Sequence, residues 1–134
     1  MRSLSVLFGL MALALTSHGA VAQAKPAAKL AGDAVAGAAA YKMRCAVCHG
    51  VQAEGGVIGP GLKGVFGAKG AAGPYAKYSP TLKAAKITWT AANLDSWLAA
   101  PAKIAPGTSM AVAVPEPMVR ENLIAYLATL KAAK

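Results

Sequence analysis

The segment RCAVCHG, from Arg44 to Gly50, contains both cysteines of this 134-residue chain and one of its two histidines. Cys45 and Cys48 are three positions apart, so on a helical turn both thiols lie on the same side. His49 follows directly. A redox disulfide, a zinc site and an anchor for a covalent cofactor all fit this spacing, and the rest of the sequence decides between them.

The surroundings of the motif disfavour the first two interpretations. A thioredoxin-like Cys-x-x-Cys pair needs a βαβ context, and no segment shows a convincing strand alternation. A structural zinc ion needs four ligands, but the other histidine, His18, lies in a predicted signal segment. A plain disulfide is geometrically possible in an oxidising compartment, but it would leave the long loop at 50–80 unexplained.

The order Cys-x-x-Cys-His is the attachment pattern of c-type haem. Two thiols one turn apart reach the two vinyl groups of one porphyrin, and the next residue, His49, brings an imidazole to the iron. Residues 50–80 are dense in glycine and proline, and a structureless loop of that length is unusual unless it wraps something. A porphyrin also supplies the apolar bulk that so small a domain lacks. The sequence therefore predicts one haem c, bound through Cys45 and Cys48.

Residues 1–24 are predicted to be a cleaved signal peptide. Arg2 precedes an apolar run that ends in small residues, and this run is shorter than the about 20 residues of a membrane-spanning helix. We therefore expect an exported periplasmic protein with no membrane span after cleavage. A flexible leader is expected at 25–32 and a single domain at 33–134.

The formal net charge of the chain is +9. Nucleic acid is one partner for a basic surface, but an exported protein rarely meets it, and the basic residues are scattered singly. A surface of this kind fits docking to an acidic protein. We expect the chain to be a monomer. Four cations are candidates for a basic ring around the site, with an ordinary solvated surface as the alternative for each: Arg44, Lys83, Lys86 and Lys103.

Helical patterns flank the loop, so the predicted fold class is all-α, with three to five helices. Asp33 can cap a helix over AVAGAAAYKMRC, and Thr90 can cap AANLDSWLAA. A last helix is predicted from about Pro117 to Leu130, with charges that match its dipole. In the helix over AANLDSWLAA, the apolar face contains Leu94, Trp97 and Leu98. In the last helix, the apolar stripe contains Val119, Leu123, either Tyr126 or Leu127, and Leu130.

The second iron ligand must be methionine, lysine or an open position, because His49 is the only histidine after residue 24. Met43 is too close to Cys45 to reach the far face. Met118 begins the last helix, where we expect it to pack. Met110 lies far along the chain in an irregular segment, which makes it the preferred candidate.

With these residues assembled, the chain resembles the class I cytochromes c, closest to the soluble bacterial c2 and mitochondrial-like branch. The resemblance runs from about Asp33 to Leu130. Gly37 and Tyr41 match the family's first helix, which crosses the last helix at Tyr126. The segments GPGL, ITW and PGTSM match the ligand-supporting loop, the propionate tryptophan and the sixth-ligand loop.

The resemblance implies a role for each of eight residues. Cys45 and Cys48 would form the thioethers, and His49 and Met110 would bind the iron. Pro60 would accept a hydrogen bond from the imidazole. Tyr78 and Trp89 would form hydrogen bonds to a haem propionate. Thr108 would support the Met110 loop.

Three positions depart from the family pattern. Ala68 stands where close relatives often carry an arginine, so charge compensation near the propionates is expected to be weaker. Trp97 replaces a tyrosine that approaches the methionine sulfur, so the hydroxyl contact is expected to be lost. Ser109 replaces a lysine.

The function implied is one-electron transfer between redox proteins through an exposed haem edge, and not an enzymatic reaction. The sole histidine after residue 24 is used by the iron, so no general base remains. Two alternatives stay open: a haem subunit of a periplasmic dehydrogenase, and a haem peroxidase or gas sensor, which needs a labile sixth position.

Overall fold

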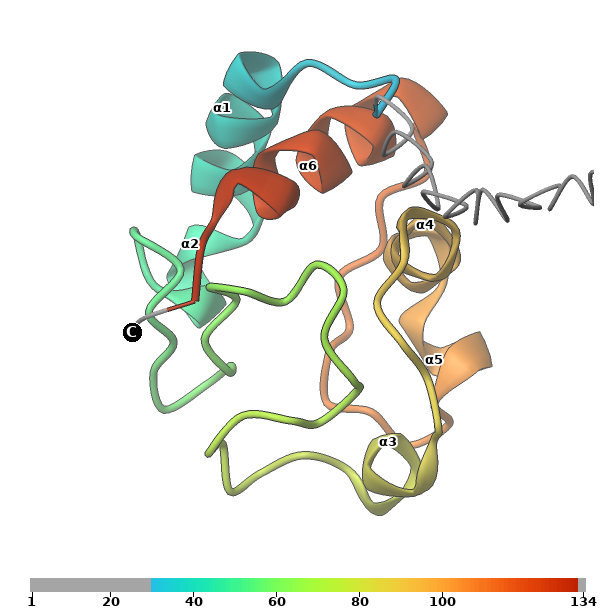
Figure 1. The fold of residues 1–134 in the computed structure, drawn as a ribbon. Helices are drawn as coiled ribbons and strands as arrows, with labels where there is room; N and C mark the ends of the chain where they lie inside the picture. The colour runs from blue at the N-terminus through green and yellow to red at the C-terminus, as the bar shows by residue number, and fades with distance from the viewer. Residues whose placement is uncertain (1–29, 133–134) are drawn as a thin grey trace, which may run out of the picture.

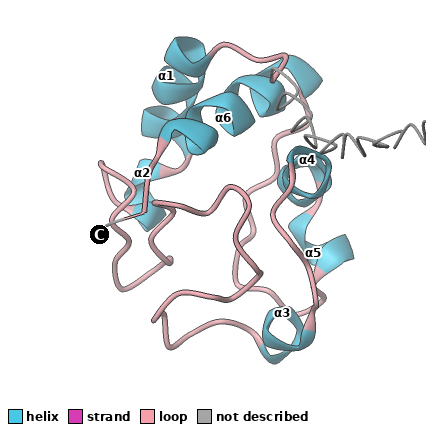
Figure 2. Cartoon of the chain, in the orientation of Figure 1, coloured by secondary structure: helices cyan, strands magenta, loops and turns pink. Residues whose placement is uncertain are grey.

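The computed structural model describes residues 30–132, so the predicted signal peptide at 1–24 and most of the leader at 25–32 lie outside the described residues. The described part is all-α, as predicted, and contains no strand element (Figure 2). It has six helices rather than three to five, because three of them span only four or five residues. The helices are α1 (Ala34–Arg44), α2 (Ala46–His49), α3 (Pro80–Ala84), α4 (Ala91–Ala99), α5 (Pro101–Ile104) and α6 (Pro117–Thr129).

Helices α1 and α6 cross side by side at one end of the molecule (Figure 1). The Asp33 side chain caps α1, as predicted, by accepting from the N–H groups of Val35 and Ala36. The Tyr41 and Tyr126 rings meet at the crossing with centroids 5.3 Å apart. This contact fixes the direction in which the chain leaves α1 toward Cys45.

Helices α4 and α6 supply most of the remaining core. Thr90 caps α4, as predicted, and Leu94, Trp97 and Leu98 are buried on it. α6 buries a wider face than the predicted stripe, because it packs on both α1 and α4. The prediction that Met118 packs is wrong: its side chain is 72% exposed, since the buried face of α6 turns away from it. The buried residues of α6 are Leu123, Ile124, Ala125 and Leu127.

The predicted loop is present: residues 50–79 contain no helix or strand element and form, with α3, the other half of the molecule (Figure 1). Backbone bonds anchor it in place of secondary structure. The Gly67 N–H donates to the Trp89 carbonyl and the Gly70 N–H to the Ile87 carbonyl, at 2.9 and 2.8 Å. The loop then ends at Pro80, which opens α3.

Within residues 30–132, no helix combines the length and the apolar character needed to cross a membrane.

Candidate cofactor-binding site

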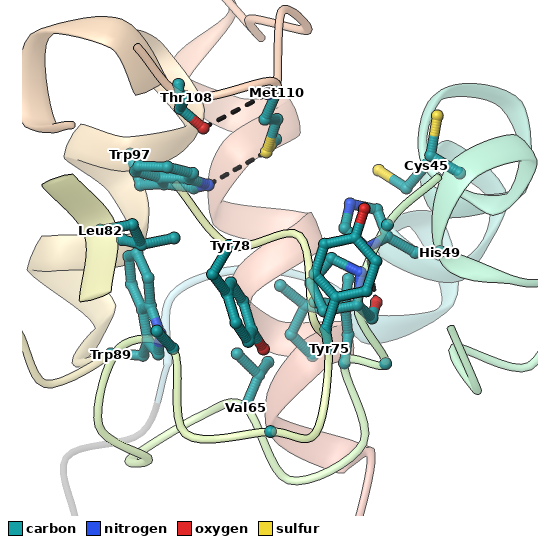
Figure 3. Close-up of a pocket in the computed structure, with 18 of the residues that line it drawn as sticks. Cys45, His49, Val65, Tyr75, Tyr78, Leu82, Trp89, Trp97, Thr108 and Met110 are labelled. Atoms are coloured by element: carbon teal, nitrogen blue, oxygen red, sulfur yellow. Dashed lines mark hydrogen bonds between the residues drawn. The ribbon is translucent and has the colours of Figure 1, made fainter. Parts of the chain in front are cut away.

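A cavity of about 450 Å³ lies between the helices and the loop half of the molecule. Its volume falls within the roughly 300–1,000 Å³ range typical of small-molecule and cofactor pockets. All eight residues singled out in the sequence line it, although they come from five separate segments. Figure 3 labels Cys45, His49, Tyr78, Trp89, Thr108 and Met110 among them. The other lining side chains are mainly apolar and include Val65, Leu82, Leu94, Leu98 and Leu123.

The two thiols sit on a tight turn between α1 and α2. The Cys45 N–H donates to the Tyr41 carbonyl at 2.8 Å, which ends α1, and the four-residue α2 then carries Cys48 and His49. Cys45 and Cys48 do not form a disulfide with each other. Burial raises the pKa of the Cys45 thiol to about 11, against the opposing effect of the Arg44 guanidinium. Cys45 therefore lacks the thiolate character of a redox-active cysteine.

One ring nitrogen of His49 is hydrogen-bonded to the protein, and the other is available to bind a metal. Its Nδ1 lies 2.8 Å from the carbonyl oxygen of Pro60. Because a carbonyl oxygen can only accept, Nδ1 carries the proton and Nε2 keeps its lone pair for a metal. Gly59, which the sequence analysis did not single out, lies directly against the ring: a Cβ there would come within 3.0 Å of His49 Nδ1.

Met110 differs from the other methionines of the described residues in where its side chain lies. Met43 and Met118 are 77% and 72% exposed and do not line the cavity. Met110 is half-buried and lines it. The Thr108 hydroxyl accepts from the Met110 N–H at 3.3 Å, which holds the turn that carries the thioether (Figure 3).

With tryptophan at position 97 there is no hydroxyl contact to the methionine sulfur, as expected, but another polar contact replaces it. Trp97 Nε1 donates a hydrogen bond to Met110 Sδ at 3.1 Å (Figure 3). The indole is held in this orientation by Trp89, whose ring meets it edge to face at 5.2 Å. The indole N–H thus takes the place of the tyrosine hydroxyl, but as a donor that cannot accept.

Two tyrosines, Tyr75 and Tyr78, also line the cavity. Tyr78 is half-buried, and burial raises the pKa of its hydroxyl, opposed by a hydrogen bond from the Gly73 backbone. Tyr75, which the sequence analysis missed, packs edge to face on Tyr78 at 5.3 Å and donates to the Ile58 carbonyl at 2.6 Å. It thereby ties two distant parts of the long loop together. Ala68 and Ser109 also line the cavity.

The predicted basic ring is only partly placed at the cavity. Arg44 lines it and forms an ion pair with Glu116 at 3.3 Å. The other three candidates are exposed and do not line it. In α3 the reason is helical geometry, because Leu82 turns toward the cavity and the adjacent Lys83 turns away. The lysines that do line the cavity are Lys63, Lys69 and Lys77.

This donor set fits a covalently attached haem. Two thiols one turn apart, an imidazole with a free Nε2 and a thioether surround an apolar cavity of suitable size. The fold and site therefore define a c-type haem protein.

Comparison with known proteins agrees with this class. Residues 34–131 match the family described as Cytochrome c. Over 121 residues the chain is 37% identical to cytochrome c2 of Rhodomicrobium vannielii, covering 88% of this chain and 95% of that one. It is 41% identical to Arabidopsis thaliana cytochrome c over 100 residues, covering 73% of this chain and 89% of the plant protein.

Two further relatives differ in length. The chain is 39% identical to "Cytochrome c-type cyt cy" of Rhodobacter capsulatus over 77% of its own residues, but spans only 52% of that protein. The solved structure of cytochrome cH from Methylobacterium extorquens superposes with a TM-score of 0.67 at 44% identity, over 73% of this chain and 99% of that one.

The chain belongs to the cytochrome c family. It is accordingly a c-type cytochrome with one covalent haem at the Cys45–Cys48 pair, and the family supports the function of a monohaem electron carrier.

Proposed function

We propose that this cytochrome is a monomeric, periplasmic one-electron carrier between redox proteins, with its haem iron held by His49 and Met110. The observation that carries the proposal is the placement of Met110 in the same apolar cavity as His49, with its sulfur fixed by the Trp97 indole. When bound, the haem iron supplies the chemistry by gaining and losing one electron. The protein's residues keep the site unchanged between the two states.

Each residue of the site limits movement or access. Cys45 and Cys48 anchor the group, and Pro60 prevents rotation of the His49 ring. The soft thioether of Met110 favours the reduced state and so raises the reduction potential. The apolar lining limits water around the site, which acts in the same direction. Tyr78 and Trp89 line the cavity, where their hydroxyl and indole N–H would donate to the haem propionates.

The site has no free general base. His49 uses Nδ1 for Pro60 and Nε2 for the metal, and no other histidine lies among the described residues. The lack of a second histidine in this part of the chain argues against a haem peroxidase. Met110 in the cavity argues against the open or labile sixth position that a peroxidase or a gas sensor requires.

The ligand assignment is tested on the exported holoprotein by X-ray absorption at the iron edge and by carbon monoxide binding. We expect one sulfur neighbour in the wild type and in Met118→Ala, which removes an exposed methionine outside the cavity. Met110→Ala should lose the sulfur neighbour, bind carbon monoxide readily and have a lower potential. A sulfur neighbour that persists in Met110→Ala refutes Met110 as the ligand.

Partner and location have their own tests. Exported protein should begin after about residue 24 on N-terminal sequencing and carry the added mass of one haem. Its reaction with an acidic redox partner should slow as salt is raised, because the cations of Lys63, Lys69 and Lys77 lie at the cavity rim. A rate independent of salt contradicts acidic docking. Co-elution with a dehydrogenase on gel filtration would indicate a complex subunit instead of a free shuttle.

A further inference from the structure

The segment that carries Met110, residues 105–116, is anchored at both ends. Near its start the Thr81 hydroxyl donates to the Pro106 carbonyl at 2.6 Å. Residues 111–113 are exposed. Val114 is then fully buried, and its N–H donates to the Leu98 carbonyl on α4 at 2.8 Å. The placement of the Met110 side chain therefore depends in part on how firmly the segment is held at residues 114–115.

Arg120, on α6, holds that end with its guanidinium. Nη1 donates to the carbonyl oxygens of Val114 at 3.0 Å and Pro115 at 2.8 Å. Nε donates to Asp95 Oδ1 at 2.7 Å, and Nη2 lies 3.5 Å from Asp95 Oδ2. The Arg120 side chain is only 11% exposed and that of Asp95 is 42% exposed, so water and salt screen the bonds of this guanidinium less than those of a fully exposed ion pair. A guanidinium that meets a carboxylate through two nitrogens is also fixed in orientation.

Helix α4 reaches the Met110 segment by two routes. Trp97 donates directly to Met110 Sδ. Asp95, two positions earlier on the same helix, orients Arg120, which binds the segment where it joins α6. Both routes oppose an outward movement of the same loop, one at its tip and one at its end.

We propose that Arg120 is a positioning residue for Met110: by clamping residues 114–115 between α4 and α6, it keeps the segment closed and the thioether in the cavity. The inference rests on the proposed function in one respect only, that Met110 binds the iron. Without the clamp, the segment opens locally more often while the rest of the fold stays intact.

Imidazole binding to the oxidised holoprotein measures this opening, because imidazole reaches the iron only after Met110 leaves. Arg120→Met keeps an unbranched apolar side chain but removes four polar contacts. We expect the saturating binding rate to rise about 10- to 100-fold, the factor that one lost charge-assisted hydrogen bond implies. Amide exchange at Val114 should accelerate by a similar factor. Lys103→Met, which removes an exposed cation on α5, should change both rates no more than about twofold.

Rates in Arg120→Met within twofold of the wild type overturn the proposal. So does an acceleration that depends on urea as steeply as global unfolding, because that indicates general destabilisation rather than local opening. If Arg120→Met does not yield folded holoprotein, Asp95→Asn replaces it. This variant keeps the bonds to both carbonyls but loses the charge that orients the guanidinium, and we expect about a 3- to 10-fold acceleration; a wild-type rate again overturns the clamp.

Failure of the proposed function looks different. If wild-type imidazole binding never saturates with concentration and the iron has no sulfur neighbour, Met110 is not the ligand. Val114 amide exchange still reports on the clamp in that case, since it depends on the segment and not on the iron.

Discussion

Replacing Gly37 with alanine tests the close crossing of α1 and α6, on which the position of the Cys-x-x-Cys turn depends. Gly37 is buried at the end of the first turn of α1. A Cβ at this position would overlap the carbonyl oxygen of Asn122 on α6 and come within 2.8 Å of Tyr126 Cβ. The first of these is backbone, so it cannot move aside as a side-chain end could, and the helices must separate.

Two effects of opposite sign determine the free energy of unfolding of Gly37→Ala. Alanine in a helix interior is favoured over glycine by about 1 kcal/mol. Overpacking a close contact costs about 3 kcal/mol, at the upper end of the usual range because backbone is struck and the Tyr41–Tyr126 contact is disturbed. We therefore expect a net loss of about 2 kcal/mol. With a urea dependence of roughly 2 kcal/mol per molar, the unfolding midpoint should fall by about 1 M.

The assay is urea unfolding of the holoprotein followed by far-ultraviolet circular dichroism. Gly56→Ala is the matched control, since a Cβ there meets nothing within 4 Å. Its midpoint should stay the same or rise slightly, because alanine restricts the unfolded chain by about 0.4–1 kcal/mol. If Gly37→Ala is as stable as the wild type or more so, the two helices do not approach as closely as described.

Three further substitutions give distinct outcomes. Trp97→Phe removes the donor to Met110 Sδ, a bond that contributes about 0.5–1.5 kcal/mol. Its loss should lower the reduction potential by about 20–60 mV in a redox titration, and Trp97→Tyr should recover part of this change. An unchanged potential in Trp97→Phe contradicts a role for the indole. Burial raises the pKa of Tyr41 well above 10, so the unfolded chain loses this proton first and wild-type stability should fall as pH rises above about 10. Tyr41→Phe should flatten that decline, yet cost about 1 kcal/mol at neutral pH through the lost bond to the Gly50 carbonyl; an equally steep decline in the variant argues against Tyr41 as its source. Cys45→Ala should leave at most one thioether, seen as a shifted pyridine haemochrome band, and an unshifted band excludes Cys45 from the attachment.

Features that depend on residues close together in the chain were predictable from the sequence. Asp33 and Thr90 mark the starts of α1 and α4, because a cap bonds to backbone groups two or three positions away. The Cys-x-x-Cys-His order indicates the cofactor through spacing on one turn. The long loop follows from its glycines and prolines. The helices α2, α3 and α5 escaped prediction because four or five residues are too few for an apolar period to show.

The contacts between side chains across the cavity were not predictable in this way, because they depend on the packing of distant elements. Trp97 reaches the Met110 loop from α4, and Tyr75 donates to the Ile58 carbonyl, seventeen positions away in the chain. Arg120 joins α6 to α4 and to the Met110 segment, and Met118, although it opens a helix with an apolar stripe, faces solvent. These contacts depend on the angles and distances at which whole elements pack, which are set by the burial of their combined apolar surfaces and are not encoded in any short run of residues.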